Sequence, residues 1–223
     1  AIALAITNDY WGVRSMAISS AIKNKIADKE TIQLISKIAE SDNKTKVQAK
    51  AIDYLAQLAN NQDFLALFEQ NTKHMSYAIS GASLSALSLI DPAKSLEIAD
   101  SLLSTAKNAQ EKSIKTVYAN HGGADKMDYF VNLLETESNY ALFSTTGLYV
   151  DFLKNQELST TTKGMDALEK LSVEATSWMV WVSERLLQEM KVYFEAELKN
   201  QNDKEVKNQI KAQVERINGL LSL

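Results

Sequence analysis

The sequence predicts an all-α protein with a HEAT/armadillo-like α-α superhelix, which is a solenoid of antiparallel helix pairs. Its 223 residues include only 7 glycines and 1 proline, so the residues that usually interrupt helices and shape strand turns are scarce. A short pattern also returns about every 30 to 35 residues and places a small residue one helical turn after an apolar one. Its three copies are Val13 with Ala17, Val47 with Ala51, and Ala78 with Ala82.

Caps and apolar periodicity place four helix pairs in the first part of the chain. Asp9 is expected to cap the first helix, and Asp28 or Thr31 opens the second. Because proline suits the first helical position, Asp91-Pro92 is expected to begin a helix. The helices of these four pairs are expected at about 9–26, 28–39, 43–58, 64–68, 75–87, 92–102, 109–120 and 125–134.

The last part of the chain is expected to complete the solenoid. A fifth apolar helix spans about 138–152, and the following Ser159–Gly164 is the most loop-like stretch because serine, threonine and glycine dominate it. This stretch divides HEAT-like repeats in residues 1–157 from terminal helices in residues 158–223, which cap the same continuous domain. The terminal helices are a long one at about 174–199 and a final one from Asp203 with an apolar stripe.

Composition narrows the classes of partner. The net charge is -4 and only Arg14, Arg185 and Arg216 are arginines, which argues against a nucleic-acid-binding surface. The longest apolar candidate for a membrane-spanning segment is Trp178–Val182. It is far shorter than the roughly 20 residues that such a segment needs. The absence of cysteine excludes disulfides and thiolate metal sites but leaves the compartment open, cytoplasmic or exported.

Sequence motifs for hydrolytic chemistry are missing. The two histidines, His74 and His121, do not form the His-Glu-x-x-His motif of helical zinc sites. His121 and Asp125 are close enough in sequence to share a metal, but a histidine that favours the dipole at a helix C-terminus is the simpler interpretation. The stretch Ser80-Gly-Ala-Ser83 lacks the second glycine of a nucleophile elbow and predicts close helix packing instead.

The glycine pair and the paired carboxylates do not predict a binding or catalytic site either. Gly122-Gly123 neither follows an expected strand nor precedes a Lys-Ser/Thr pair, so it does not predict a phosphate-binding loop. Two pairs of carboxylates lie two residues apart, on different helix faces, and are expected to be solvated: Glu135 with Glu137, and Glu195 with Glu197. The sequence therefore assigns no catalytic residue, no cofactor-binding residue and no metal ligand to this chain.

Aromatic residues of the long helix near the C-terminus allow two interpretations. Trp178 and Trp181 lie on adjacent faces, and Tyr193 and Phe194 follow further along. They are expected to pack in the core or between helices, whereas a surface for a ligand or partner is the alternative.

The first six residues, Ala-Ile-Ala-Leu-Ala-Ile, lack the basic start of a signal peptide and run directly into Thr7-Asn-Asp9. They are typical of the last turns of a helix. We therefore expect the sequence to be a segment of a longer polypeptide.

The segment Asp9-Tyr-Trp-Gly-Val-Arg14, followed by Ala17-Ile18 and Ala21-Ile22, resembles the opening of the HEAT-like repeats in the C-terminal helical domain of M1-family zinc aminopeptidases, notably the bacterial branch. The motif covers about 15 residues. The period of the helix pairs, the Asp91-Pro92 helix start and the two long terminal helices are compatible with that domain over most of the chain.

This resemblance implies that the zinc ligands, the catalytic glutamate and the Gly-x-Met-Glu-Asn motif lie in an upstream domain of the same polypeptide. Zinc is then a cofactor of the parent metallo-aminopeptidase and not of this segment, which alone is expected to be inactive. In that family the helical domain closes over the catalytic domain, limits peptide access and in some members contacts the far end of the peptide. The alternative is an independent HEAT-repeat scaffold that binds another protein.

Overall fold

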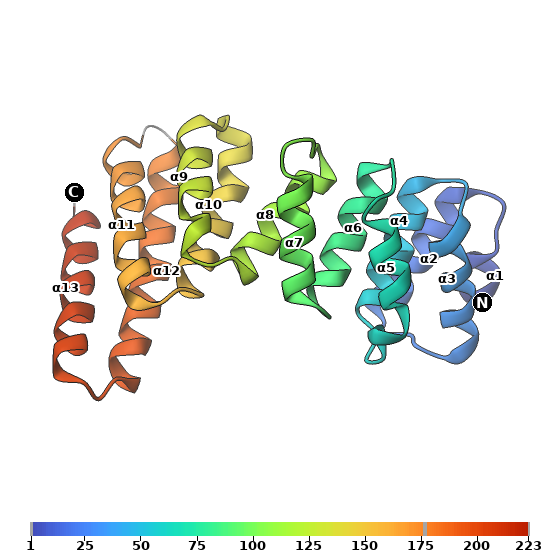
Figure 1. Ribbon diagram of the computed structural model, residues 1–223, viewed down its shortest axis with the longest axis horizontal. Coiled ribbons are helices and arrows are strands. Elements are labelled where there is room, and N and C mark those ends of the chain that lie inside the picture. Colours follow the sequence, from blue (N-terminus) through green and yellow to red (C-terminus); the bar gives the residue numbers. More distant parts are fainter. Residues whose placement is uncertain (1, 176–177, 223) are drawn as a thin grey trace. The chain divides into compact units, whose positions relative to one another are not determined.

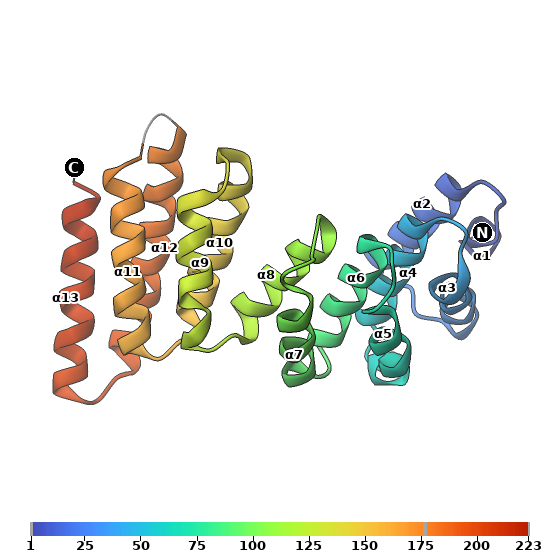
Figure 2. The ribbon, with the colours of Figure 1, turned by 45° about the horizontal axis from the view of Figure 1, so that its top comes forward.

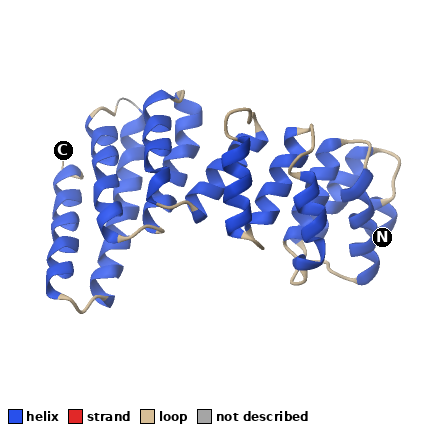
Figure 3. Cartoon of the chain, in the orientation of Figure 1, coloured by secondary structure: helices blue, strands red, loops and turns tan. Residues whose placement is uncertain are grey.

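The computed structural model describes residues 2–175 and 178–222, and this part of the chain consists of helices and loops without a strand (Figure 3). The predicted all-α class is therefore confirmed. The α-helices are α1 Ile2–Ile6, α2 Trp11–Lys23, α3 Lys29–Ser41, α4 Thr45–Ala56, α5 Leu65–Asn71, α6 Tyr77–Ser88, α7 Pro92–Leu102, α8 Ala109–His121, α9 Met127–Thr136, α10 Asn139–Lys154, α11 Leu158–Val173, α12 Trp178–Asn200 and α13 Lys204–Leu220. Two short 3-10 helices are η1 Asn61–Phe64 and η2 Ala124–Lys126.

The chain forms two compact units, Ala1–Val117 and Tyr118–Leu223. Their division falls inside α8. The division expected from the sequence, at residues 157 and 158, lies within the second unit, at the start of α11.

In the first unit, α2, α4 and α6 form one layer, and α3, α5 and α7 cover them in a second layer (Figure 1). Of the repeated small residues, Ala17 of α2 and Ala51 of α4 are buried, and Ala82 of α6 is half-buried. Apolar side chains from both layers fill the space between them. The core includes Ile18, Ile35, Ile52, Leu55, Phe68, Ile79 and Leu87.

In the second unit, α9 to α13 run alternately in opposite directions (Figures 1 and 2). Helices α10 and α12 pack on each other, and α9, α11 and α13 lie against them. Three buried rings join α9 to α10, because Phe130 lies 5.9 Å from Tyr149 and 5.0 Å from Phe152, measured between ring centroids. Burial raises the pKa of Tyr149, whose hydroxyl donates a hydrogen bond to the Gly164 carbonyl at 2.8 Å.

Three of the predicted helix starts are confirmed by side-chain caps. The Asp28 carboxylate accepts the Thr31 N–H at 3.0 Å, and the Asp91 carboxylate accepts the Lys94 N–H at 2.9 Å, with Pro92 as the first residue of α7. Asp203 caps α13 in the same way. An aspartate cap stabilises the start of a helix because its carboxylate accepts hydrogen bonds from N–H groups that have no partner inside the helix.

The predicted Asp9 cap is wrong. Helix α2 begins at Trp11, and its N-cap residue is Tyr10. The N–H of Tyr10 donates to the Asn8 side chain, while the carbonyl of Asp9 accepts a hydrogen bond from Arg14. This part of the chain is therefore organised around the Arg14 guanidinium and not around a carboxylate cap.

The predicted loop at Ser159–Gly164 is also wrong, because these residues form the first turns of α11. The buried Thr161 hydroxyl donates to the Leu153 carbonyl at 2.8 Å, so a polar side chain is accommodated between α10 and α11. Gly164 allows close approach, since a Cβ there would overlap with Leu153 Cδ2. Small and polar residues in this stretch serve helix packing.

We expect Asp28→Ala to lower the melting temperature near neutral pH and to have little effect in acid. Hydrogen bonds from the Thr31 N–H and then the Thr31 hydroxyl hold the pKa of Asp28 below its usual value. A carboxyl with a lowered pKa in the folded state stabilises the fold above its unfolded pKa of about 3.9, and this contribution is lost as the pH falls through the folded pKa. Melting curves of both proteins between about pH 7 and pH 2 check this. A difference in melting temperature that is the same at every pH would contradict it.

Candidate functional site

The first unit contains a groove of about 350 Å³ on α4, α6 and α8. Lysines from two of these helices line it, Lys46 and Lys50 on α4 and Lys112 on α8, together with Asp53 of α4. Lys46, Lys50 and Asp53 lie at i, i+4 and i+7 and therefore share one face of α4. We call this feature the lysine groove.

The floor of the lysine groove consists of small side chains. They are Ala49, Ala78, Ala82, Ser85, Ala109, Ser113 and Thr116. Across the floor, the Ser85 hydroxyl donates to the Ser113 hydroxyl at 2.9 Å, which joins α6 to α8. Because these side chains are small, they leave the space between the lysines open.

The charge balance of the lysine groove favours an anionic ligand. Lys50 Nζ donates to the Ser19 hydroxyl at 2.8 Å, and neither Lys46 nor Lys112 pairs with a carboxylate of the described residues. Desolvation raises the pKa of Asp53, with the charge of Lys50 opposing this effect. Three ammonium groups around one carboxylate leave a positive potential that attracts carboxylates or phosphates.

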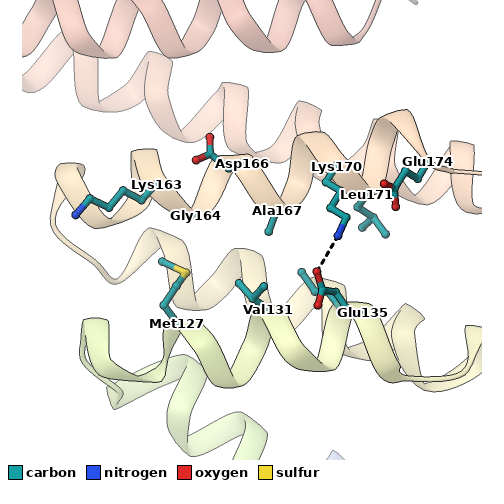
Figure 4. A pocket seen from close by; sticks show the side chains of 11 residues that line it. Met127, Val131, Glu135, Lys163, Gly164, Asp166, Ala167, Lys170, Leu171 and Glu174 are labelled. Carbon is teal, nitrogen blue, oxygen red and sulfur yellow. Dashed lines mark hydrogen bonds and ion pairs between the residues drawn. The ribbon is translucent and has the colours of Figure 1, made fainter.

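The second unit contains a larger groove of about 550 Å³ between α9 and α11 (Figure 4). Its walls are apolar, with Met127 and Val131 from α9 facing Ala167 and Leu171 from α11. An ion pair of 2.8 Å between Lys170 Nζ and Glu135 Oε1 crosses it. Charges of both signs stand at its rim, so its lining does not favour a ligand of one charge.

The serines singled out in the sequence lie inside the first unit. Ser80 is fully buried, donates to the Thr72 carbonyl at 2.5 Å and accepts a hydrogen bond from Gln110 Nε2 at 2.6 Å. Gly81, the next residue, lies against the backbone of Ala109. Close helix packing at Ser80–Ser83 is therefore confirmed, and the Ser80 hydroxyl is engaged in structural hydrogen bonds.

The two histidines lie next to helix ends. His74 Nδ1 accepts the Ser76 N–H at 2.9 Å just before α6, and His121 is the last residue of α8. Asp125 pairs with Lys126 at 3.0 Å. Within residues 2–175 and 178–222, no group of three or more histidine or carboxylate side chains is arranged to hold a metal ion.

The paired carboxylates point to separate partners. Glu135 pairs with Lys170, whereas Glu137 accepts a hydrogen bond from the Thr145 hydroxyl at 2.5 Å. Glu195 and Glu197 are exposed on α12. Glu137 is the C-cap residue of α9 and lies outside the helix, so the expected arrangement of two solvated carboxylates on one helix applies to Glu195 and Glu197 and not to Glu135 and Glu137.

The aromatic residues of α12 divide between core and surface. Phe194 is fully buried, whereas Trp181 is 58% exposed and stacks on Phe143 of α10. Tyr193 is half-buried. The side chain of Trp178 lies outside the described part of the structure. Core packing is therefore confirmed for Phe194, whereas Trp181 contacts a second helix through Phe143 and leaves more than half of its side chain exposed.

Sequence reasoning missed the lysine groove. The spacing of Lys46, Lys50 and Asp53 shows that they share a face of α4, but it does not show that Lys112 lies beside them. The position of Lys112 beside α4 depends on how α8 packs against α6. Residue spacing within a single helix does not predict this packing.

Neither a scan against known protein families nor a search of curated proteins finds a match to this chain. None of the helices within the described ranges has the length and apolar character needed to cross a membrane.

Proposed function

We propose that this chain is the non-catalytic helical domain of an M1-type zinc aminopeptidase, with a HEAT-like superhelix that closes over an upstream catalytic domain and limits the access of peptides. The segment Asp9-Tyr-Trp-Gly-Val-Arg14 is the observation that supports this assignment, because it is the part of the sequence that resembles that family. The two-layered packing of helices in the first unit is compatible with repeats of this kind.

The resembling segment also has a defined structural role. Arg14 binds the Asp42 carboxylate through two hydrogen bonds, of 2.8 and 2.9 Å, and donates to the carbonyls of Asn8 and Asp9. A Cβ at Gly12 would lie 2.6 Å from the Tyr10 ring, so glycine allows that ring to fold back onto α2. The arginine and the glycine of the segment are thus both explained by packing at the entry to the helical layers.

In this function the lysine groove binds the peptide. Its three ammonium groups attract the carboxylates of a peptide, and its floor of small residues admits an extended backbone. The reaction itself is assigned to the upstream domain of the parent protein, with its own zinc ion.

The coding sequence upstream of Ala1 gives the first test. An open frame that encodes His-Glu-x-x-His with a downstream glutamate is expected. A start codon at this point, or an unrelated upstream domain, would overturn the assignment in favour of the independent scaffold, which a stable protein partner of the isolated chain would then support.

The second test uses the parent enzyme and replaces Lys46, Lys50 and Lys112 together by glutamine. We expect the KM for peptides of about ten residues to rise roughly 10-fold, because charge attraction in the groove is lost. The KM for a short aminoacyl chromogenic substrate, which does not reach the groove, should stay unchanged. The matched control replaces three exposed lysines of the same unit, Lys29, Lys37 and Lys44. Equal effects of the two triple variants would exclude a role of the groove.

A further inference from the structure

Phe143 of α10 and Trp181 of α12 form an exposed aromatic stack in the second unit. Their ring centroids lie 6.3 Å apart and their planes are inclined by 10°. Phe143 is 41% exposed and Trp181 is 58% exposed. Tyr140, one turn before Phe143, is 93% exposed. Neighbouring exposed aromatic side chains are typical of protein interaction sites, where they supply much of the binding energy.

Arg185 of α12 completes this cluster. Its guanidinium carbon lies 5.7 Å from the ring centroid of Phe143 and 6.0 Å from that of Trp181, which is the geometry of a cation-π interaction. We call Phe143, Trp181 and Arg185 the aromatic-arginine site. The rings hold the guanidinium in place without using its hydrogen-bond donors.

The three arginines of the chain differ in their partners. Arg14 pairs with Asp42, and Arg216 pairs with Asp166 and Glu169. Within the described residues, the Arg185 guanidinium has no hydrogen bond and no ion pair. An exposed guanidinium that is held against two rings therefore has its donors available for a carboxylate from another molecule.

The site continues along an exposed face of α12. Trp181, Arg185, Gln188 and Val192 follow one another at spacings of four, three and four residues and are all exposed, with Val192 at 64%. This face is about 17 Å long, calculated from the helical rise per residue. It has room for a peptide segment of several residues, with apolar contacts at both ends and polar groups between them.

We propose that the aromatic-arginine site docks a protein segment that carries a carboxylate next to an aromatic or large aliphatic side chain. The carboxylate binds the donors of Arg185, and the apolar side chain covers the exposed face of Trp181. Charge complementarity selects an acidic segment, since a basic one would place like charges beside Arg185. This inference does not depend on the proposed function, because the site lies in the second unit and outside the lysine groove.

A random peptide library displayed on phage tests this inference, with the folded chain as bait. We expect the selected peptides to share aspartate or glutamate next to an aromatic or large aliphatic residue. The best peptide is then synthesised and titrated into the isotope-labelled chain, and the indole N–H signal of Trp181, assigned with Trp181→Phe, should shift on binding. Selected peptides that lack the acidic-apolar pair would overturn the inference.

Two variants of α12 test whether peptide binding depends on Arg185. Arg185→Gln should weaken the binding of the selected peptide by about 10-fold or more. Lys191→Gln removes the same charge from the same helix and should leave binding unchanged, because Lys191 is outside the aromatic-arginine site. If both variants bind the peptide equally, the guanidinium has no specific role and the inference is wrong.

Association between two copies of the chain is the competing use of this surface. Sedimentation equilibrium of wild type and Trp181→Ala distinguishes it. We expect wild type to remain monomeric at the concentrations of the titration. A dimer that Trp181→Ala dissociates would overturn docking of an acidic segment in favour of self-association.

Discussion

Arg14→Met is expected to destabilise the first unit by about 3–5 kcal/mol, the largest effect of any substitution considered for this chain. The side chains of Arg14 and Asp42 are only 10% and 5% exposed. Removal of the guanidinium leaves the Asp42 carboxylate buried without its counter-charge, and it frees the carbonyls of Asn8 and Asp9. A buried charge that loses its partner costs far more than an exposed ion pair contributes.

Urea unfolding followed by circular dichroism measures this effect. The double variant Arg14→Met with Asp42→Asn should recover part of the loss, because the uncompensated charge is removed together with the arginine. Arg185→Met is the matched control, since it makes the same chemical change at an exposed position and should alter stability by less than about 0.5 kcal/mol. A loss below about 1 kcal/mol for Arg14→Met would show that water reaches Asp42 in the folded chain.

Local signals in the sequence predicted many helix boundaries. Asp91 and Asp203 were identified as helix starts, and Asp28 as one of two candidates with Thr31, because an N-cap depends on contacts within three residues, which the sequence displays directly. The apolar stripe of the final helix was predicted for the same reason, and its members Ile210 and Ile217 are buried in α13. Contacts within one helix can therefore be predicted from a single sequence.

Contacts between different helices could not be predicted from the sequence. Thr161 and Gly164 resemble loop residues when only their neighbours in sequence are considered, whereas their roles depend on Leu153 and Tyr149 of the preceding helix. Trp181 was expected to pack in the core or between helices, and its large exposed surface was not predicted, because a helical spacing does not say which face of α12 other helices cover. Lys112 of the lysine groove likewise has its place through the packing of α8 on α6.

The second large effect is expected for Gly81→Ala, because the added Cβ would meet backbone atoms. It would lie 2.7 Å from the Ala109 carbonyl oxygen, 2.8 Å from the Ala109 carbonyl carbon and 3.0 Å from the Gln110 nitrogen. A backbone cannot turn aside as a flexible side chain can, so α8 would have to move away from α6. Such a shift would strain the hydrogen bond from Gln110 Nε2 to the buried Ser80 hydroxyl.

We expect a net loss of about 1–3 kcal/mol for Gly81→Ala, since overpacking outweighs the roughly 1 kcal/mol by which alanine favours a helix over glycine. Gly147→Ala is the matched control, because Gly147 lies inside α10 and its added Cβ would meet nothing within 4 Å. That variant should therefore gain up to about 1 kcal/mol from helix propensity alone. If α8 approaches Gly81 as closely as described, urea unfolding will show a lower free energy of unfolding for Gly81→Ala and a higher one for Gly147→Ala, each compared with wild type. A gain for Gly81→Ala as well would mean that α8 yields easily, and the floor of the lysine groove would then be adaptable.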